Sequence, residues 1–331
     1  MLAYETLAEK GCRRLQMRFS VIIPAYNARE VLERTVRSAL AQTFDDFEVI
    51  ISDDGSSDDT LVLAEELAAR DSRVKILTGL NGGCSVARNR GFEVASGEFC
   101  VLLDAEDMLK PQYLATMSAF IDARPGYDVY SCNGDRLMAG GRTEPFFSGP
   151  EYARETTWKL DDLIPVDRIF IMAAVRRDTH RRVGGFRSDL RYAEDYDFWL
   201  RALASGARHR FTPESLGTYV ESAGGKSKNR IPHAQAQIRI FEGLSAIPEL
   251  NDEQRALCAR KLEGLRTRIE RIKLETRLQA GEYEGARSAY RKVSDAYLSK
   301  PLYALGWIAM MVSPRLYARL FAARDATRSA S

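Results

Sequence analysis

The chain has 331 residues, of which 45% are apolar and 28% charged, as in an ordinary globular protein. Its 48 basic and 46 acidic residues give a net charge of +2, which argues against a dedicated nucleic-acid-binding protein. Five cysteines without a Cys-x-x-Cys pair and only three histidines argue against a zinc site. The length predicts a main domain with an appended region.

Residues 1–16 are charged and lack the long apolar stretch of a signal peptide. A basic and then apolar run starts at Met17, so we expect residues 1–16 to form an extension outside the fold. The main domain is predicted over residues 17–230 and a helical region over 231–331. We expect Cys84, Cys100 and Cys132 to be reduced and in or near the core, as is typical of a cytoplasmic protein.

Four short apolar segments alternate with amphipathic segments in the first 125 residues. The apolar segments, predicted as strands, are residues 19–25, 47–52, 74–78 and 99–103. A helix is predicted after each strand, with Ser57 capping the second helix and Pro111 opening the fourth. Strands that are apolar throughout and separated by helices indicate a parallel sheet covered on both faces. The fold class is therefore α/β, with a doubly wound, mainly parallel, Rossmann-like sheet.

Polar clusters follow these predicted strands. After the first three strands they are residues 24–27, Asp53-Asp54 and Asn81-Gly82-Gly83. Each cluster alone has an ordinary interpretation as a turn or a helix cap. Because parallel strands end at the same edge of a sheet, the clusters together predict a ligand site there.

The segment VLLDAEDMLK, residues 101–110, ends the fourth strand with three carboxylates, Asp104, Glu106 and Asp107. Carboxylate oxygens are the ligands that Mg2+ and Mn2+ prefer. An acidic strand end at this edge of the sheet is suited to hold such a cation against a phosphate group.

The sequence resembles the inverting nucleotide-sugar glycosyltransferases of family 2, which have the GT-A fold. The resemblance rests on four blocks in order: SVIIPAYNAREVLERTVRSALAQ, VIISDDGSSDDT, NGGCSVARNRGFEVASGEFCVLLDAEDMLKP and VGGFRSDLRYAEDYDFWLRA. It covers roughly residues 19–219, and the ordered series is more specific than any single block.

The resemblance implies a donor site for a nucleoside diphosphate sugar, with UDP as the default nucleotide. The implied donor-site residues are Pro24, Ala25, Tyr26, Asn27, Asp53, Asp54, Asn81, Gly82, Arg88, Asp104 and Ala105. The ring of Tyr26 is expected beside the base, and Asp53 with Asp54 is expected to hydrogen-bond it. Arg88 is expected beside the diphosphate and the donor sugar.

The resemblance also implies a divalent cation, Mg2+ or Mn2+, at the fourth strand. Its expected ligands are Asp104, Glu106 and Asp107. Most family members have Asp-x-Asp-Asp here, whereas this chain has Asp104-Ala105-Glu106-Asp107. The Glu106 side chain is one methylene longer, and Mg2+ tolerates displaced ligands poorly. Metal binding is expected, and the contribution of Glu106 is open.

Glu194 and Asp195 are predicted to open a helix, where acidic residues are favoured for electrostatic reasons alone. The resemblance implies that Asp195 is the catalytic base, which takes the acceptor proton, and that Glu194 orients the acceptor or the helix end. The chain has no Q-x-x-R-W motif, which marks processive synthases of this family, so we expect single sugar additions. The expected acceptor is a glycan or lipid-linked saccharide in polysaccharide biosynthesis. The alternative is a catalytically silent sugar-nucleotide-binding scaffold.

The polar loop ESAGGKSKNR, residues 221–230, has two interpretations. It is either an exposed linker or a lid whose Lys226, Lys228 or Arg230 closes over the diphosphate.

The region after residue 233 is predicted to be helical. Its apolar seam is Cys258, Leu262, Leu265, Ile269 and Ile272. The seam either packs against neighbouring parts of the chain or forms a homodimer contact. Residues 302–312 are apolar but shorter than the ~18 residues that span a bilayer. We expect these residues to form one of three things: a peripheral membrane contact, a buried helix or a subunit contact.

Overall fold

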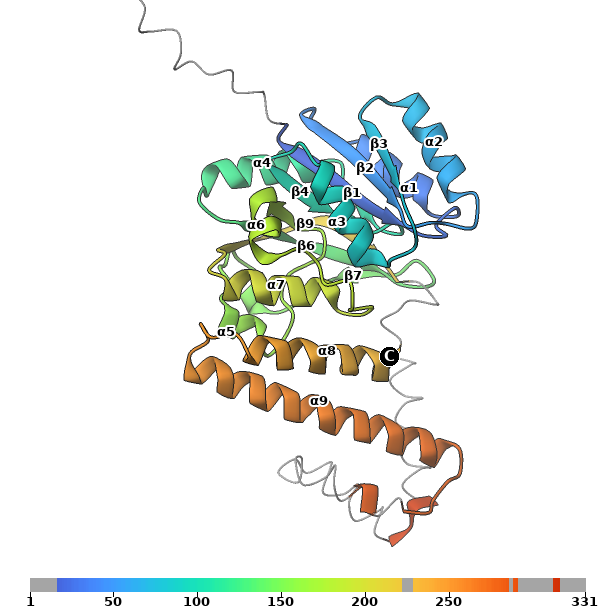
Figure 1. Ribbon diagram of the computed structural model, residues 1–331, viewed down its shortest axis with the longest axis vertical. Helices are drawn as coiled ribbons and strands as arrows, with labels where there is room; N and C mark the ends of the chain where they lie inside the picture. Colours follow the sequence, from blue (N-terminus) through green and yellow to red (C-terminus); the bar gives the residue numbers. More distant parts are fainter. Residues whose placement is uncertain (1–16, 222–228, 286–287, 291–311, 316–331) are drawn as a thin grey trace, which may run out of the picture. The chain divides into compact units, whose positions relative to one another are not determined.

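The computed structural model describes residues 17–221, 229–285, 288–290 and 312–315. The chain divides into two compact units between Gly225 and Lys226, close to the predicted boundary at residue 230. The first unit contains the sheet, and the described part of the second is helical (Figure 1). The predicted extension at residues 1–16 lies outside the described residues.

The described residues of the first unit form a nine-stranded sheet. Its strands are β1 (Phe19–Ala25), β2 (Phe47–Asp53), β3 (Val74–Thr78), β4 (Phe99–Leu102), β5 (Met108–Leu109), β6 (Val129–Leu137), β7 (Thr143–Pro145), β8 (Ala174–Arg176) and β9 (His209–Val220). Their order is β3-β2-β1-β4-β8-β6-β9-β5, with β7 paired to β6. The β3-β2-β1-β4 half is parallel, whereas β8 and β5 each pair antiparallel to their neighbours.

The parallel half confirms the prediction from the apolar segments, because every residue of β1, β2 and β4 is buried. Its helices are α1 (Leu32–Leu40), α2 (Thr60–Arg70), α3 (Cys84–Val94) and α4 (Tyr113–Ala123). Right-handed crossovers place α1 and α2 on one face of these strands and α3 on the other. The predicted cap at Ser57 is wrong, because α2 begins three residues later. The Ser57 N–H instead donates to Asn27 Oδ1.

The mixed half of the sheet was not predicted. It includes the long pair β6 and β9, which run parallel to each other. The 3-10 turn η1 (Pro150–Tyr152), α5 (Leu160–Leu163), α6 (Arg177–Val183) and α7 (Glu194–Ala204) connect its strands. Gly134 of β6 allows close packing there, since a Cβ at this position would lie 2.5 Å from the Phe170 ring. The end of β9 pairs with β5, which brings it beside the acidic turn after β4.

The strand order reverses direction beside β1. The chain passes from β1 through β2 to β3 and then returns to β4 on the other side of β1. Ligands of open α/β sheets bind outside the carboxyl ends of the strands at such a point. The ends of β1 and β4 therefore flank the expected ligand position.

The second unit contains α8 (Arg230–Ser245) and α9 (Asp252–Gln279). An Asn251–Gln254 capping box begins α9. Of the five predicted seam residues, Cys258, Leu265, Ile269 and Ile272 are buried and Leu262 is half-buried, and α9 packs against α8. The packing interpretation of the seam is confirmed, and a homodimer contact stays a prediction.

The predicted apolar segment 302–312 lies outside the described residues, except for Val312. None of the described helices is long and apolar enough to cross a membrane. Cys84, Cys100, Cys132 and Cys258 are not joined in disulfides, which agrees with the reduced state predicted for the first three.

Candidate functional site

The turn after β1 exposes Tyr26 and is tied to the end of β2. Tyr26 is 52% exposed, whereas Pro24 and Ala25 are buried within β1. Asn27 has a left-handed backbone with φ of 47°, which asparagine tolerates better than most residues. Its Oδ1 accepts a hydrogen bond from the Ser57 N–H at 2.9 Å. The loops after β1 and β2 are therefore joined while the Tyr26 ring stays exposed.

Asp53 and Asp54, at the end of β2, are buried and shape the neighbouring loop. Asp53 accepts a hydrogen bond from the Thr78 hydroxyl at 3.2 Å. Asp54 accepts hydrogen bonds from the N–H groups of Gly82 at 3.0 Å and Gly83 at 2.7 Å. Both carboxylates thus already bind the protein itself, and their expected contact with a base stays a prediction.

The loop between β3 and α3 carries Asn81 and Leu80 at the surface. Arg90 of α3 donates to the Leu80 carbonyl at 2.9 Å and to the Asp54 carboxylate at 3.0 Å. These contacts fix the backbone, and Leu80 is 92% exposed. Since β3 and β1 lie on either side of β2, this loop and the Tyr26 turn flank the end of β2.

The acidic segment after β4 turns sharply and is held by α1. The Asp107 N–H donates to the Asp104 carbonyl at 3.0 Å, and the Thr35 hydroxyl of α1 donates to the Ala105 carbonyl at 2.7 Å. Asp104 and Glu106 are partly exposed, and 32% of the Asp104 side chain is accessible. Two of the three predicted carboxylates are therefore partly accessible at the surface.

Asp107 is fully buried, unlike its two acidic neighbours. Its Oδ1 accepts a hydrogen bond from the Val220 N–H of β9 at 2.9 Å. Its Oδ2 is buried and has no hydrogen-bond partner among the described residues. Burial raises the pKa of Asp107 well above its ordinary value, and the charge of Asp104 adds to the shift. Asp107 thus anchors the end of β9.

Arg88 of α3 joins the end of β4 to the start of α7. Its side chain is 2% exposed, with Nη2 donating to Asp104 Oδ1 at 2.6 Å and Nη1 to Glu194 Oε1 at 3.1 Å. The guanidinium lies 5.4 Å from the centre of the Phe186 ring. The structure therefore brings three predicted site residues into one chain of contacts.

Asp195 follows Glu194 in the first turn of α7 and is partly buried. The preceding Ala193 has a left-handed backbone with φ of 55°, a strained conformation of the kind that occurs at functional sites. Burial raises the pKa of Asp195 to about 6, the charge of Glu194 adds to this shift, and Arg88 opposes it. A carboxylate whose pKa lies near neutrality is suited to accept a proton.

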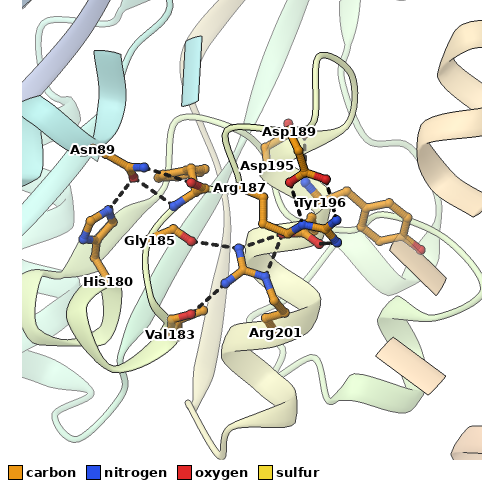
Figure 2. A network of polar contacts seen from close by, with 11 residues as sticks. Asn89, His180, Val183, Gly185, Arg187, Asp189, Asp195, Tyr196 and Arg201 are labelled. Carbon is orange, nitrogen blue, oxygen red and sulfur yellow. Dashed lines mark hydrogen bonds and ion pairs between the residues drawn. The ribbon is translucent and has the colours of Figure 1, made fainter. Parts of the chain in front are cut away.

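The loop before α7 is clamped to that helix by Arg201 (Figure 2). Its guanidinium donates to the carbonyl oxygens of Val183 and Gly185, both at 2.8 Å. It also donates from Nε to Asp197 Oδ2 at 2.7 Å, and Asp197 is 2% exposed. The clamp therefore contains a buried ion pair within the helix that carries Asp195.

Asn89 of α3 holds the other side of the same loop (Figure 2). Its amide exchanges two hydrogen bonds of 2.8 Å with the backbone of Phe186. Its Oδ1 also accepts from His180 Nε2 at 2.8 Å, and burial lowers the pKa of His180 to about 4. Only glycine fits at Gly185, because φ is +73° and a Cβ would lie 2.9 Å from Asn89 Oδ1.

The described residues contain no group of three or more His, Cys, Asp or Glu side chains arranged to hold a metal ion. The predicted set of Asp104, Glu106 and Asp107 is not gathered, because the Asp107 carboxyl bonds to β9. Mg2+ is often bound by one or two carboxylates together with phosphate oxygens of the substrate. Asp104 and Glu106 fit a cation shared with a bound phosphate in this way.

The predicted lid at residues 221–230 lies mostly outside the described residues, including Lys226 and Lys228. Arg230 begins α8 and pairs with Glu275 at 3.3 Å. Closure of these side chains over a diphosphate stays a prediction.

Sequence reasoning missed the residues that hold the site in place, Asn89, Asp197 and Arg201. The spacing of Asp197 and Arg201 is that of a helical ion pair, and this signal was readable. Nothing in the spacing, however, indicates that the pair is buried or that Arg201 reaches the loop before the helix.

Two known proteins illustrate the sequence similarity of the chain. The succinoglycan biosynthesis protein ExoO of Rhizobium meliloti is 29% identical over 314 residues, covering 92% of this chain and 86% of that protein. The O-antigen biosynthesis protein RfbC of Myxococcus xanthus is 33% identical over 202 residues, covering 59% of this chain. The chain spans 15% of the length of RfbC and 19% of that of a Pasteurella multocida chondroitin synthase.

Solved structures share the fold of this chain. S. aureus TarS 1–349 in complex with UDP-GlcNAc matches with a TM-score of 0.63 and 21% identity, over 92% of this chain and 88% of that one. The mannosyltransferase PcManGT from Pyrobaculum calidifontis, in complex with GDP-Man and Mn2+, matches with a TM-score of 0.58 and 20% identity. The match covers 91% of this chain and 86% of the mannosyltransferase chain. These likenesses establish the GT-A fold.

The family model of glycosyl transferase family 2 matches residues 20–184. This range contains the strand ends from β1 to β4 and Arg88, and it ends at Gly184, before Glu194 and Asp195. The chain therefore belongs to glycosyltransferase family 2.

Proposed function

We propose that the protein is an inverting glycosyltransferase that moves one sugar from a nucleoside diphosphate sugar to an acceptor hydroxyl. One observation carries the proposal: buried Arg88 contacts both Asp104, at the donor-side strand end, and Glu194, beside Asp195. Arg88 thereby connects Asp104, which is suited to bind a cation and a phosphate, to the helix start that carries Asp195, whose pKa is about 6. Both kinds of group are needed for transfer from a diphosphate sugar.

Asp195 acts as the general base in this proposal. Its ionised carboxylate accepts the proton of the acceptor hydroxyl as that oxygen attacks the anomeric carbon from the face opposite the leaving diphosphate. Attack from that face inverts the anomeric configuration. Glu194 and Arg88 hold the start of α7 in place, which fixes the direction from which Asp195 takes the proton.

Asp104 and Glu106 would hold a divalent cation, Mg2+ or Mn2+, together with the diphosphate. When bound, the cation offsets the negative charge that develops on the leaving group. Asp107 holds the acidic turn after β4 in place, because its carboxyl group accepts a hydrogen bond from the Val220 N–H of β9.

The donor is proposed to be a UDP-sugar and the acceptor a glycan or lipid-linked saccharide in polysaccharide biosynthesis. The TarS and PcManGT structures carry UDP-GlcNAc and GDP-Man, so both nucleotides belong in the test. The names of ExoO and RfbC support a polysaccharide product.

A thermal-shift panel of nucleotide sugars, with and without Mn2+, tests the proposal. We expect one nucleotide class to raise Tm by several degrees, and more so with Mn2+, because a ligand that binds the folded state stabilises it. The stabilising donor is then assayed for transfer and hydrolysis. Binding without either reaction would support the silent scaffold, and the absence of any stabilising donor would overturn the proposal.

The rate of transfer is expected to depend on pH through Asp195. Because the base must be ionised, kcat/KM should fall about tenfold per pH unit below about 6 and level off above it. The measurement is kcat/KM for the donor from pH 4.5 to 8.5, with Tm recorded at each pH to exclude unfolding. A flat profile between pH 5 and 7 would contradict the assignment of the base.

A further inference from the structure

Arg88 is unusual among the arginines of this site because it is buried and serves two carboxylates at once. The side chain is 2% exposed, and its two Nη groups donate to Asp104 at 2.6 Å and to Glu194 at 3.1 Å. Its Nε is buried without a hydrogen-bond partner among the described residues. The guanidinium is therefore almost fully enclosed, and its main interactions are with these two carboxylates.

Its two partners belong to opposite sides of the proposed reaction. Asp104 ends β4 on the donor side, and Glu194 begins α7 next to the proposed base Asp195. A single cation shared between two anions in a low-dielectric site is divided between them. Any change that withdraws one anion strengthens the interaction of Arg88 with the other.

A divalent cation at Asp104 would withdraw that anion. It would compete with Arg88 for the same carboxylate, because Arg88 Nη2 already lies 2.6 Å from Asp104 Oδ1. Arg88 would then interact mainly with Glu194. The stronger Arg88–Glu194 ion pair would hold the start of α7 more firmly. By reciprocity, loss of the Glu194 charge would turn Arg88 toward Asp104 and weaken cation binding.

We propose that Arg88 is a positioning residue that couples cation binding at Asp104 to the Glu194–Asp195 pair. The inference rests on the proposed function for the identity of the two sites. The two hydrogen bonds of Arg88, to Asp104 and to Glu194, are observed in the structure and do not depend on the proposed function. The coupling gives the base its working position when donor and cation are present.

The test measures binding, so that it does not depend on turnover. The affinity of the UDP-saturated protein for Mn2+ is determined by calorimetry for the wild type, Glu194→Gln, Arg88→Lys and the double variant. We expect Glu194→Gln to weaken Mn2+ binding by about fivefold or more in the wild-type background. In the Arg88→Lys background the same change should alter it by less than about twofold, because one ammonium group cannot bridge both carboxylates.

Arg18 provides the matched control. It also bridges two carboxylates, Glu98 at 2.7 Å and Asp122 at 2.6 Å, and it precedes β1 at the opposite end of the strand from the site. Arg18→Lys should leave the affinity for Mn2+ unchanged and should preserve the full effect of Glu194→Gln.

A second measurement is the pH dependence of kcat/KM, which reports on the ionisation of Asp195. In the wild type the acidic limb of the pH profile should move to lower pH as Mn2+ is raised, because Arg88, released from Asp104, would offset more of the Glu194 charge that raises the pKa of Asp195. In Arg88→Lys this movement should be smaller. A purely structural role for Arg88 would lower Tm without changing how the limb responds to Mn2+.

The outcomes separate this inference from the proposed function. Unchanged Mn2+ affinity in Glu194→Gln overturns the coupling, and this variant decides the matter even where Arg88→Lys is too unstable to purify. Equal effects of Glu194→Gln in both backgrounds also overturn it. A wild type that binds no nucleotide sugar in the thermal-shift panel overturns the proposed function and the coupling together.

Discussion

Asp195→Asn is expected to lower the rate of sugar transfer about 10³-fold while leaving the affinity for the donor within about threefold of the wild type. Asparagine has nearly the same shape but cannot accept the acceptor proton. The effect should therefore fall on kcat rather than on donor binding. Transfer is measured with the donor identified by thermal shift, and donor affinity by calorimetry.

The stability of this variant separates a chemical defect from a folding defect. The folded-state pKa of Asp195 lies above its unfolded value, so ionisation of this group costs stability as pH rises through about 6. The neutral asparagine avoids that cost. We expect Tm of Asp195→Asn to exceed that of the wild type at pH 8, and the difference to shrink below pH 5.

Asp178→Asn is the matched control for Asp195→Asn. Asp178 is also an acidic residue in the first turn of a helix, α6. Unlike Asp195, it is exposed, and its ion pair with Arg181 lies at the surface. Its substitution should leave transfer within about twofold of the wild type. Wild-type activity in Asp195→Asn would remove Asp195 from the role of base.

Arg201→Met is expected to lower the free energy of unfolding by about 3 kcal/mol or more. The change leaves the buried Asp197 carboxylate without its closest partner and frees the carbonyl oxygens of Val183 and Gly185. Urea unfolding followed by circular dichroism gives the free energy. The loop before α7 should also become more accessible to proteases.

Two further variants give this prediction its controls. Arg181→Met removes an exposed pair with Asp178 in α6 and should cost less than about 1 kcal/mol. Removing both charges, as Asp197→Leu with Arg201→Met, should restore part of the loss, because no unpaired carboxylate remains buried. A full loss in the double variant would assign the effect to the loop carbonyls instead, and an unchanged free energy in Arg201→Met would contradict the clamp.

The strands of the parallel half were predictable because each is short, apolar throughout and bounded by turn residues. For β1 and β3 the predicted and observed bounds agree, at residues 19–25 and 74–78. The mixed half was missed because β9 contains Pro213, Gly217 and several polar residues and has no clear two-residue alternation. Its pairing with β6 depends on contacts between segments about 80 residues apart, which no local pattern records.

The sequence by itself determined that carboxylates stand at the end of β4 and at the start of α7. It did so because strand ends and helix starts carry local signals, and because the ordered blocks resemble family 2. Only the tertiary structure decided which carboxylates share an environment. Asp107 is buried against β9 while Asp104 is partly exposed, although they stand three residues apart. Arg88 joins Asp104 to Glu194, and its expected contact with the donor stays a prediction. The physical reason is that burial and charge pairing depend on the elements packed around a residue, and these come from distant parts of the chain.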